Sequence, residues 1–251
     1  KPPLLVFCTK LTLCCSHGVL PVLPSAFLFF FATDAAVFSL VNKCSDSVWP
    51  GIQPGAGKPQ LLNGGFQLKP HETATINVPT GWSGRFWGRH GCSFDASGKG
   101  TCDTGDCGGV LKCDGVGGAP PATLAEFTLD SPQDLYDVSL VDGYNMEISI
   151  SPSGGSRSCR TVKCLSDLNQ RCPSGLEVKK KGVTIACKSA CLAFDTSQYC
   201  CTRAYSSPQT CKPTGYSKAF KSACPMAYSY AYDDPTSIFT CQNANYSIVF
   251  C

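Results

Sequence analysis

The sequence carries little charge and has no strongly basic surface pattern. Only 16% of its 251 residues are charged, and the net charge is +3. Proteins that bind nucleic acids through the phosphate backbone need a much denser array of Lys and Arg. The one basic run is Lys179 to Lys181, which is better explained as an exposed loop. We therefore expect no nucleic-acid partner.

Residues that bind metals through nitrogen are also scarce. The three histidines, His17, His71 and His90, do not stand at a ligand spacing from one another, and the chain lacks paired Cys-x-x-Cys knuckles. A structural zinc site requires one of these patterns. We therefore expect neither a metal nor another cofactor.

Long hydrophobic runs are absent. Apolar residues dominate from Val19 to Phe31, but Pro21, Pro24 and Ser25 interrupt them. The remaining run is too short for a bilayer span, which needs about 20 apolar residues, and fits the apolar core of a secretory signal. The small residues Thr33 and Ala35 precede Ala36, and we expect the signal peptidase to cut just before Ala36. Residues 1–35 are thus predicted to be a signal peptide with an upstream extension; a retained anchor helix is the alternative.

Cysteine, by contrast, is abundant. The chain has nineteen cysteines; Cys8, Cys14 and Cys15 fall in the segment expected to be removed, which leaves sixteen, an even number, from Cys44 to Cys251. Cysteine at this density belongs in an oxidising compartment, where it forms disulfides. The pattern predicts a secreted protein with no stable membrane span in its mature form.

No long helical period appears in the mature chain. Short runs of mixed apolar and polar residues, bounded by Gly, Pro and Asn, predict strands instead. Such strands favour a β-sandwich or barrel. We expect them at 37–42, 73–78, 85–89, 124–129, 137–141, 146–150 and 246–250, with helices near 186–194 and 218–223. Two cysteine-rich excursions, 91–118 and 164–224, have too little apolar periodicity to fold without disulfides.

Several motifs, taken together and in this order, resemble the thaumatin-like proteins of the osmotin and pathogenesis-related type. The resemblance covers about residues 36–251. Its motifs are Gly-Trp-Ser-Gly-Arg-Phe-Trp-Gly-Arg-His-Gly-Cys at 81–92, Thr-Cys-Asp-Thr-Gly-Asp-Cys-Gly-Gly at 101–109, Pro-Pro-Ala-Thr-Leu-Ala-Glu-Phe at 120–127, Tyr-Asp-Val-Ser-Leu-Val-Asp-Gly-Tyr-Asn at 136–145, Gln-Tyr-Cys-Cys-Thr at 198–202 and Cys-Pro-Met-Ala-Tyr-Ser-Tyr at 224–230.

The resemblance implies a mainly β fold held by eight disulfides. Its core would be a flattened β-sandwich formed by about residues 36–90, 119–163 and 225–251, with a small loop domain at 91–118 and a disulfide-rich domain of helices and loops at 164–224. The implied bridges are Cys44–Cys251, Cys92–Cys102, Cys107–Cys113, Cys159–Cys241, Cys164–Cys224, Cys172–Cys187, Cys191–Cys200 and Cys201–Cys211.

The resemblance also implies a cleft lined by one arginine and four acids. By motif these residues are Arg85, Glu126, Asp137, Asp142 and Asp233. Arg89 and Asp234 are alternatives for the arginine and the last acid. Clustered acids raise at least one pKa, as glycoside cleavage requires. If the chain hydrolyses a sugar, Glu126 is the expected general acid and Asp137 or Asp142 the base. Each acid taken alone is better explained by a structural role.

Three functions follow as hypotheses. The first is a secreted antifungal defence protein that binds β-1,3-glucan or a related cell-wall polysaccharide and acts as a monomer in the apoplast, with the vacuole as an alternative. The second is a weak endo-β-1,3-glucanase. The third is a non-enzymatic interaction or inhibitor protein. Asn245 heads the sequence Asn-Tyr-Ser, a glycosylation sequon beside the last expected strand.

Overall fold

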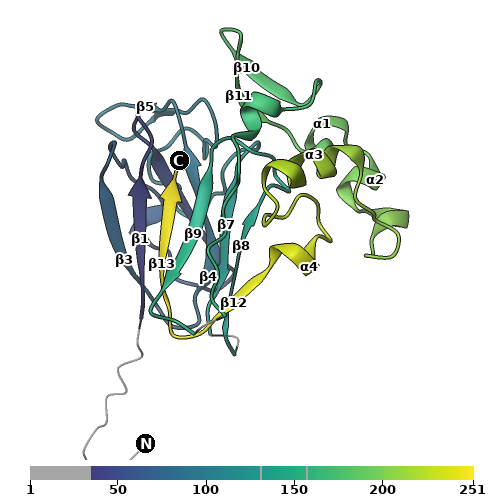
Figure 1. The fold of residues 1–251 in the computed structure, drawn as a ribbon. Helices are drawn as coiled ribbons and strands as arrows, with labels where there is room; N and C mark the ends of the chain where they lie inside the picture. The colour runs from purple at the N-terminus through teal and green to yellow at the C-terminus, as the bar shows by residue number, and fades with distance from the viewer. Residues whose placement is uncertain (1–34, 131, 157) are drawn as a thin grey trace, which may run out of the picture. The chain divides into compact units, whose positions relative to one another are not determined.

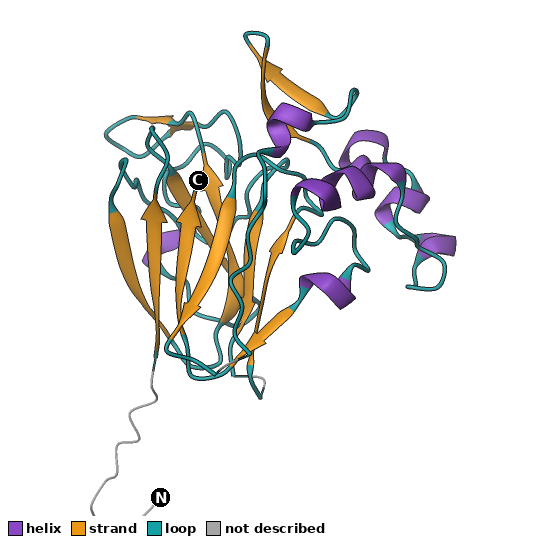
Figure 2. Cartoon of the chain, viewed as in Figure 1, coloured by secondary structure: helices purple, strands orange, loops and turns teal. Residues whose placement is uncertain are grey.

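The structure is a computed structural model that describes residues 35–130, 132–156 and 158–251. The predicted signal segment, apart from Ala35, therefore lies outside the described residues. Among the described residues, strands form two large sheets, of four and five strands, and two small sheets of two strands each, and the α-helices gather to one side (Figures 1 and 2).

The first sheet joins the two ends of the described chain. Its strand order is β3 (Thr73–Val78), β1 (Ala36–Asn42), β13 (Asn245–Phe250) and β9 (Ile148–Ser153). Strands β1 and β13 pair in parallel, and the other two pairs are antiparallel. The strand that comes last in sequence thus occupies an interior position, between β1 and β9.

The second sheet is antiparallel throughout. Its order is β12 (Phe239–Cys241), β8 (Asp134–Ser139), β7 (Leu124–Thr128), β4 (Ser83–Arg89) and β2 (Trp49–Pro54). Gly51 of β2 lies opposite Trp87 of β4, and a Cβ atom on Gly51 would collide with the indole ring. A glycine is required here because the Trp87 ring covers the neighbouring strand.

Aromatic side chains from both sheets fill the space between them. The Phe38 ring lies 4.7 Å from that of Phe127 and 5.2 Å from that of Tyr246, measured between ring centroids. Two of the tyrosine hydroxyls in this core donate hydrogen bonds: Tyr246 donates to Asp134 Oδ2 at 2.6 Å, and Tyr136 donates to the Arg160 carbonyl at 2.7 Å. The core is thus apolar in bulk, with its polar atoms satisfied.

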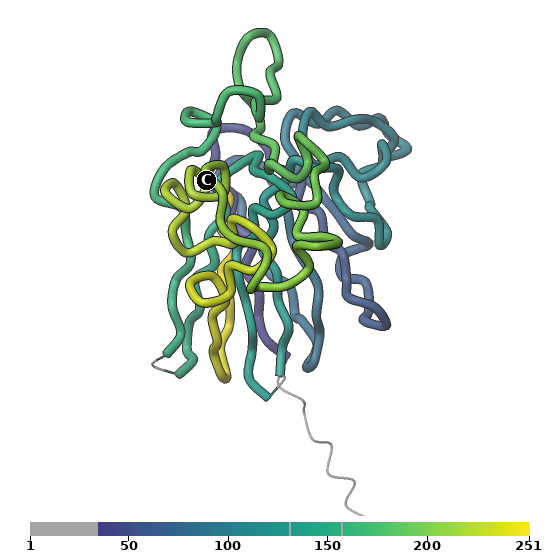
Figure 3. The backbone as a smooth tube through the Cα atoms, turned by 90° about the vertical axis from the view of Figure 1, so that its right-hand side faces the viewer, coloured from purple at the N-terminus to yellow at the C-terminus, as the bar shows by residue number. Residues whose placement is uncertain are grey.

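Two segments rich in disulfides leave the sandwich. The segment 91–118 contains only the short strands β5 (Ser93–Phe94) and β6 (Gly100–Thr101). The segment 164–224 contains the hairpin β10 (Glu177–Lys180) and β11 (Val183–Cys187), followed by helices α1 (Ala190–Phe194), α2 (Ser197–Cys200) and α3 (Gly215–Ala223). Figure 3 looks at the side that carries these helices. Short 3-10 turns lie at Leu62–Gly64, Leu168–Arg171 and Arg203–Tyr205.

Local capping explains why α3 forms where it does. The Thr214 hydroxyl accepts from the Ser217 N–H, and the Ser217 hydroxyl accepts from the Thr214 N–H at 2.8 Å, which completes a capping box. The expected helix at 218–223 is confirmed as the end of α3. The expected helix at 186–194 is confirmed only in its second half, because Ala186 and Cys187 belong to β11.

All sixteen cysteines from Cys44 onward are paired. The eight bridges are those that the resemblance implied, from Cys44–Cys251 across 207 residues to Cys107–Cys113 across 6. The predicted mainly β fold with eight disulfides is confirmed. The division into three domains stays a prediction.

Three smaller findings concern the described residues only. No helix among them is both long and apolar enough to cross a bilayer. No group of three or more potential metal ligands is found among them. Asn245 begins β13 with an exposed side chain whose Oδ1 accepts from the Val37 N–H at 2.8 Å. Its glycosylation stays a prediction.

Candidate functional site

Three of the predicted site residues lie in one row across the five-stranded sheet. Arg85 in β4 is directly opposite Glu126 in β7, and Glu126 is directly opposite Asp137 in β8. Opposite residues on antiparallel strands project to the same face, with Cβ atoms about 5 Å apart. The register of the sheet therefore brings together three residues that are far apart in the sequence.

The alternation of side chains along each strand turns this row outward. Phe86 and Phe127, the neighbours of Arg85 and Glu126, are buried in the core between the sheets. Successive strand residues point to opposite faces, so Arg85 and Glu126 point away from that core. Farther along the outer face, Trp87 and Leu124 pack against the Cys107–Cys113 bridge of the segment 91–118. The segment 91–118 therefore covers the outer face at Trp87 and Leu124 and leaves the row of Arg85, Glu126 and Asp137 uncovered.

Two cavities adjoin this row on the outer face. The first, of about 390 Å³, is lined by Arg85, Glu126 and Asp137 together with Asp142, Asp234, Tyr228, Leu124, Ser139, Val141 and Ala231; we call it the acidic cavity. The second, of about 350 Å³, shares Arg85, Glu126 and Asp137, and its other walls come from the opposite ends of the same strands, from the end of β2 and from Ile238 after α4. Both volumes lie in the range of ligand sites.

Asp234, rather than the expected Asp233, lines the acidic cavity. The Asp233 carboxylate accepts from the Ser229 N–H at 3.0 Å and the Ser229 hydroxyl at 2.8 Å, and it lies 3.0 Å from Lys221 Nζ. Asp234 starts α4 (Asp234–Ser237), and its Oδ1 accepts from the Tyr228 hydroxyl at 3.1 Å. The two acids are neighbouring aspartates, so residue type cannot distinguish them. Their hydrogen bonds show that Asp233 anchors the backbone and side chain of Ser229, whereas Asp234 faces the cavity.

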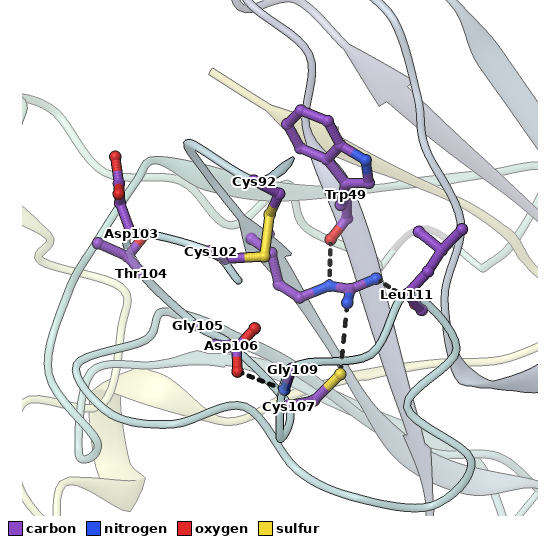
Figure 4. The surroundings of a disulfide bond; sticks show 12 residues. Trp49, Cys92, Cys102, Asp103, Thr104, Gly105, Asp106, Cys107, Gly109 and Leu111 are labelled. Atoms are coloured by element: carbon purple, nitrogen blue, oxygen red, sulfur yellow. Dashed lines mark hydrogen bonds between the residues drawn. A yellow bond between two sulfur atoms is a disulfide. The ribbon is translucent and has the colours of Figure 1, made fainter. Parts of the chain in front are cut away.

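Arg89 is not a cavity residue. It lies on the same face as Arg85 but is completely buried under the segment 91–118. Its guanidinium donates to the carbonyls of Trp49 at 3.0 Å, Val110 at 2.9 Å and Leu111 at 2.7 Å. Figure 4 shows the hydrogen bonds that reach Trp49 and Cys107 beside the Cys92–Cys102 bridge. Burial lowers the pKa of Arg89 to about 10, so it remains a cation at neutral pH.

The acidic cavity raises the pKa values of two of its carboxyl groups. Burial, together with the charges of Glu126 and Asp234, raises the pKa of Asp137 to about 8. Burial also raises the pKa of Glu126; Arg85 opposes this rise, and Asp142 adds to it. The Oδ1 atom of Asp137 is buried without a hydrogen-bond partner, which independently disfavours an ionised carboxylate there. At neutral pH, Asp137 therefore retains a proton beside other acids.

Sequence reasoning missed the contribution of Tyr228. Burial and the hydrogen bond to Asp234 raise the pKa of Tyr228, so its hydroxyl stays protonated and donates within the acidic cavity. Tyr228 belongs to the Cys-Pro-Met-Ala-Tyr motif at 224–228, which carried the resemblance but suggested no role for this side chain. Its backbone pairs with that of Ser139, the last residue of β8, which fixes its place in the cavity.

This arrangement suits a neutral ligand rich in hydroxyl groups. The acidic cavity presents carboxylate acceptors, with a protonated carboxyl group and one guanidinium as donors. The Tyr228 hydroxyl donates its proton to Asp234 and so offers a ligand a further acceptor. Among the described residues, no carboxylate lies within ion-pair distance of Arg85, so its donors face the open row. Convergent donors and acceptors of this kind orient a polar ligand by hydrogen bonds rather than by net charge.

Comparisons with known proteins agree with this fold. The Thaumatin family matches residues 42–251. The chain is 60% identical over 217 residues to the pathogenesis-related thaumatin-like protein 3.5 of Cryptomeria japonica, covering 86% of this chain and 90% of that protein. It is 49% identical over 229 residues to a glucan endo-1,3-beta-glucosidase of Prunus avium, covering 89% and 94%.

Among solved structures, a laminaripentaose-producing beta-1,3-glucanase in complex with laminaritetraose has a similar fold. The TM-score is 0.61 at 12% sequence identity, over 86% of this chain and 98% of that chain. A likeness at this identity concerns the fold alone. The match of the family over residues 42–251 and the close relatives lead to one conclusion: the chain belongs to the thaumatin family.

Proposed function

We propose that the chain is a secreted defence protein that binds the β-1,3-glucan of fungal walls in its acidic cavity and thereby acts against fungi. The observation that carries this proposal is the row of Arg85, Glu126 and Asp137 on the open face of the sheet, completed by Asp142 and Asp234. The pathogenesis-related relative supports a role in defence, and the relative named as a glucan endo-1,3-beta-glucosidase supports glucan as the ligand.

The chemistry of the cavity supports a neutral polysaccharide. Each glucose unit offers hydroxyl groups that donate to carboxylates and accept from a guanidinium or a protonated carboxyl group. An anionic polymer would meet repulsion from the acids, whereas a neutral glucan does not. The sheet holds the row rigidly, which lowers the entropic cost of binding.

The disulfides fit a protein that works outside the cytosol. Eight bridges form only in an oxidising compartment and limit the freedom of the unfolded chain. We place the protein in the apoplast, with the vacuole as the alternative, and expect it to act as a monomer.

Retention on insoluble β-1,3-glucan tests the binding proposal. We expect the wild-type protein to sediment with the polysaccharide and Glu126→Leu to stay in solution, because leucine removes the central acceptor of the row. Glu72→Leu is the matched control, since Glu72 is exposed just before β3, in the other sheet. If the wild-type protein is not retained, the proposal is wrong.

Weak hydrolysis of the same polymer is a second candidate, favoured by the raised pKa of Asp137. A carboxyl group that keeps its proton near neutral pH, opposite a second carboxyl group, is the arrangement that glycoside cleavage uses. The order of roles then differs from the one expected from the sequence: we propose Asp137 as the general acid and Glu126 as the second carboxyl group of the pair. Residue types could not reveal this, because the pKa of each acid depends on its burial.

Release of reducing sugar from laminarin tests this second candidate. We expect activity to fall as the pH rises through about 8, where Asp137 loses its proton. Asp137→Asn and Glu126→Gln should each remove the activity while the folded structure remains. Release that continues unchanged in both variants would rule out this pair of residues, and no release by the wild-type protein would leave binding as the whole function.

A further inference from the structure

The second cavity on the outer face differs from the acidic cavity in its chemistry. Among the described residues that line it, the charged ones are Arg85, Glu126 and Asp137, all three shared with the acidic cavity. The remaining walls are neutral: Gln53, Ser83 and Thr128 are polar, and the others are apolar or are glycines. We call it the neutral cavity.

The register of the sheet shows that the two cavities are consecutive parts of one surface. Ser83, Thr128 and Leu135 form a row of opposite residues across β4, β7 and β8. Each of them lies two positions from Arg85, Glu126 or Asp137 and therefore on the same face. In the other direction, two positions beyond Glu126 and Asp137, Leu124 and Ser139 line the acidic cavity. Since two strand residues span about 7 Å, these rows extend over about 14 Å.

The acids therefore lie in the middle of the surface and not at its end. From this placement we infer that the neutral cavity is a second binding arm for the same polysaccharide, so that an internal stretch of a β-1,3-linked glucan chain lies across the row with segments in both cavities. This inference rests on the proposed function and adds to it the part of the ligand that is bound.

The walls of the neutral cavity suit the uncharged continuation of a sugar chain. Ile238 follows α4, lines the neutral cavity and is 41% exposed. It can cover the apolar face of a sugar ring, while the hydroxyls of Ser83 and Thr128 exchange hydrogen bonds with the ring substituents. Thr128 is exposed, and its hydroxyl makes no hydrogen bond to another described residue, so it is available to a ligand.

Affinity as a function of chain length tests the inference. The probes are β-1,3-linked glucose oligomers of increasing length, titrated calorimetrically into the wild-type protein and into the double variant Ile238→Ala/Thr128→Leu. The alanine removes the apolar platform, and the leucine removes the hydroxyl and fills part of the arm. The control is Val183→Ala/Thr75→Leu, because Val183 and Thr75 are also exposed but lie on β11 and β3.

We expect wild-type affinity to rise with length until both arms are filled. The double variant should bind the shortest oligomers as the wild type does and the longest ones roughly tenfold more weakly, the loss that corresponds to about 60 Å² of apolar contact. The control should match the wild type at every length.

Other outcomes overturn the inference in distinguishable ways. If oligomers bind but affinity does not depend on length, or if the double variant matches the wild type on long oligomers, the second arm is refuted and glucan binding stands. If the double variant weakens short and long oligomers equally, its effect comes from the acidic row, and the arm is again refuted. If no oligomer binds to the wild-type protein, the proposed function itself fails, and the inference fails with it.

Discussion

Replacing Asp137 by asparagine should stabilise the protein at neutral pH, although it removes a central residue of the site. In the folded protein Asp137 has a pKa of about 8, whereas an unfolded chain has an aspartate pKa near 3.9. Between these values the folded state binds one proton that the unfolded state has released. The free energy of unfolding therefore falls as the pH rises, by about 1.4 kcal/mol for each pH unit contributed by this group. Asparagine is neutral at every pH and removes this slope.

The measurement is urea denaturation at about pH 5, 6 and 7, with the disulfides intact. From about pH 5 to about pH 7, the stability of Asp137→Asn relative to the wild type should increase by about 2.7 kcal/mol, two pH units at the slope given above. Asp195→Asn is the matched control, since Asp195 is an exposed aspartate at the C-cap of α1 in a left-handed conformation that asparagine also adopts. Equal slopes in wild type and variant, or a variant that loses stability as the pH rises, would refute the assignment of the proton to Asp137.

Three further predictions concern the cations around the site. Arg85→Gln should raise the pKa of Glu126 further, because the guanidinium now opposes that rise; carboxyl ¹³C NMR titration measures it, and an unchanged pKa would show that the two groups do not interact. Lys221→Met leaves the largely buried Asp233 carboxylate without its cation and should lower the free energy of unfolding by about 2 kcal/mol; an unchanged melting temperature would contradict this. Arg89→Met removes the donors to the carbonyls of residues 49, 50, 110 and 111 and should destabilise by about 4 kcal/mol in denaturation, whereas a loss below about 1 kcal/mol would show that water replaces these donors.

The strands were predictable where local pattern and burial agree. The expected strands at 37–42, 73–78 and 246–250 correspond closely to β1, β3 and β13. Strand β2 was missed because Trp-Pro-Gly-Ile-Gln-Pro contains two prolines and a glycine, which normally interrupt strands. The glycine is required by the Trp87 ring, a contact between segments that local sequence does not reveal.

The site was predictable in composition but not in arrangement. Motif matching found Arg85, Glu126, Asp137 and Asp142, all of which line the acidic cavity. The order of the acids along the sheet depends on the pairing of β4, β7 and β8, and pairing between strands is a property of the folded chain. For the same reason the sequence did not reveal which acid keeps a proton.

The interior position of β13 has a consequence for how the protein is made. The strand lies between β1 and β9, so the four-stranded sheet cannot close until residues 245–250 are available. During synthesis, about 200 residues and most of the cysteines leave the ribosome after β1 and before β13, its parallel neighbour, is available for pairing. The four-stranded sheet is therefore complete only after β13 has left the ribosome, and cysteines that meet earlier do so before this sheet can select their partners. We therefore expect correct pairing to depend on a disulfide isomerase, and expression in a host that lacks one to give scrambled bridges.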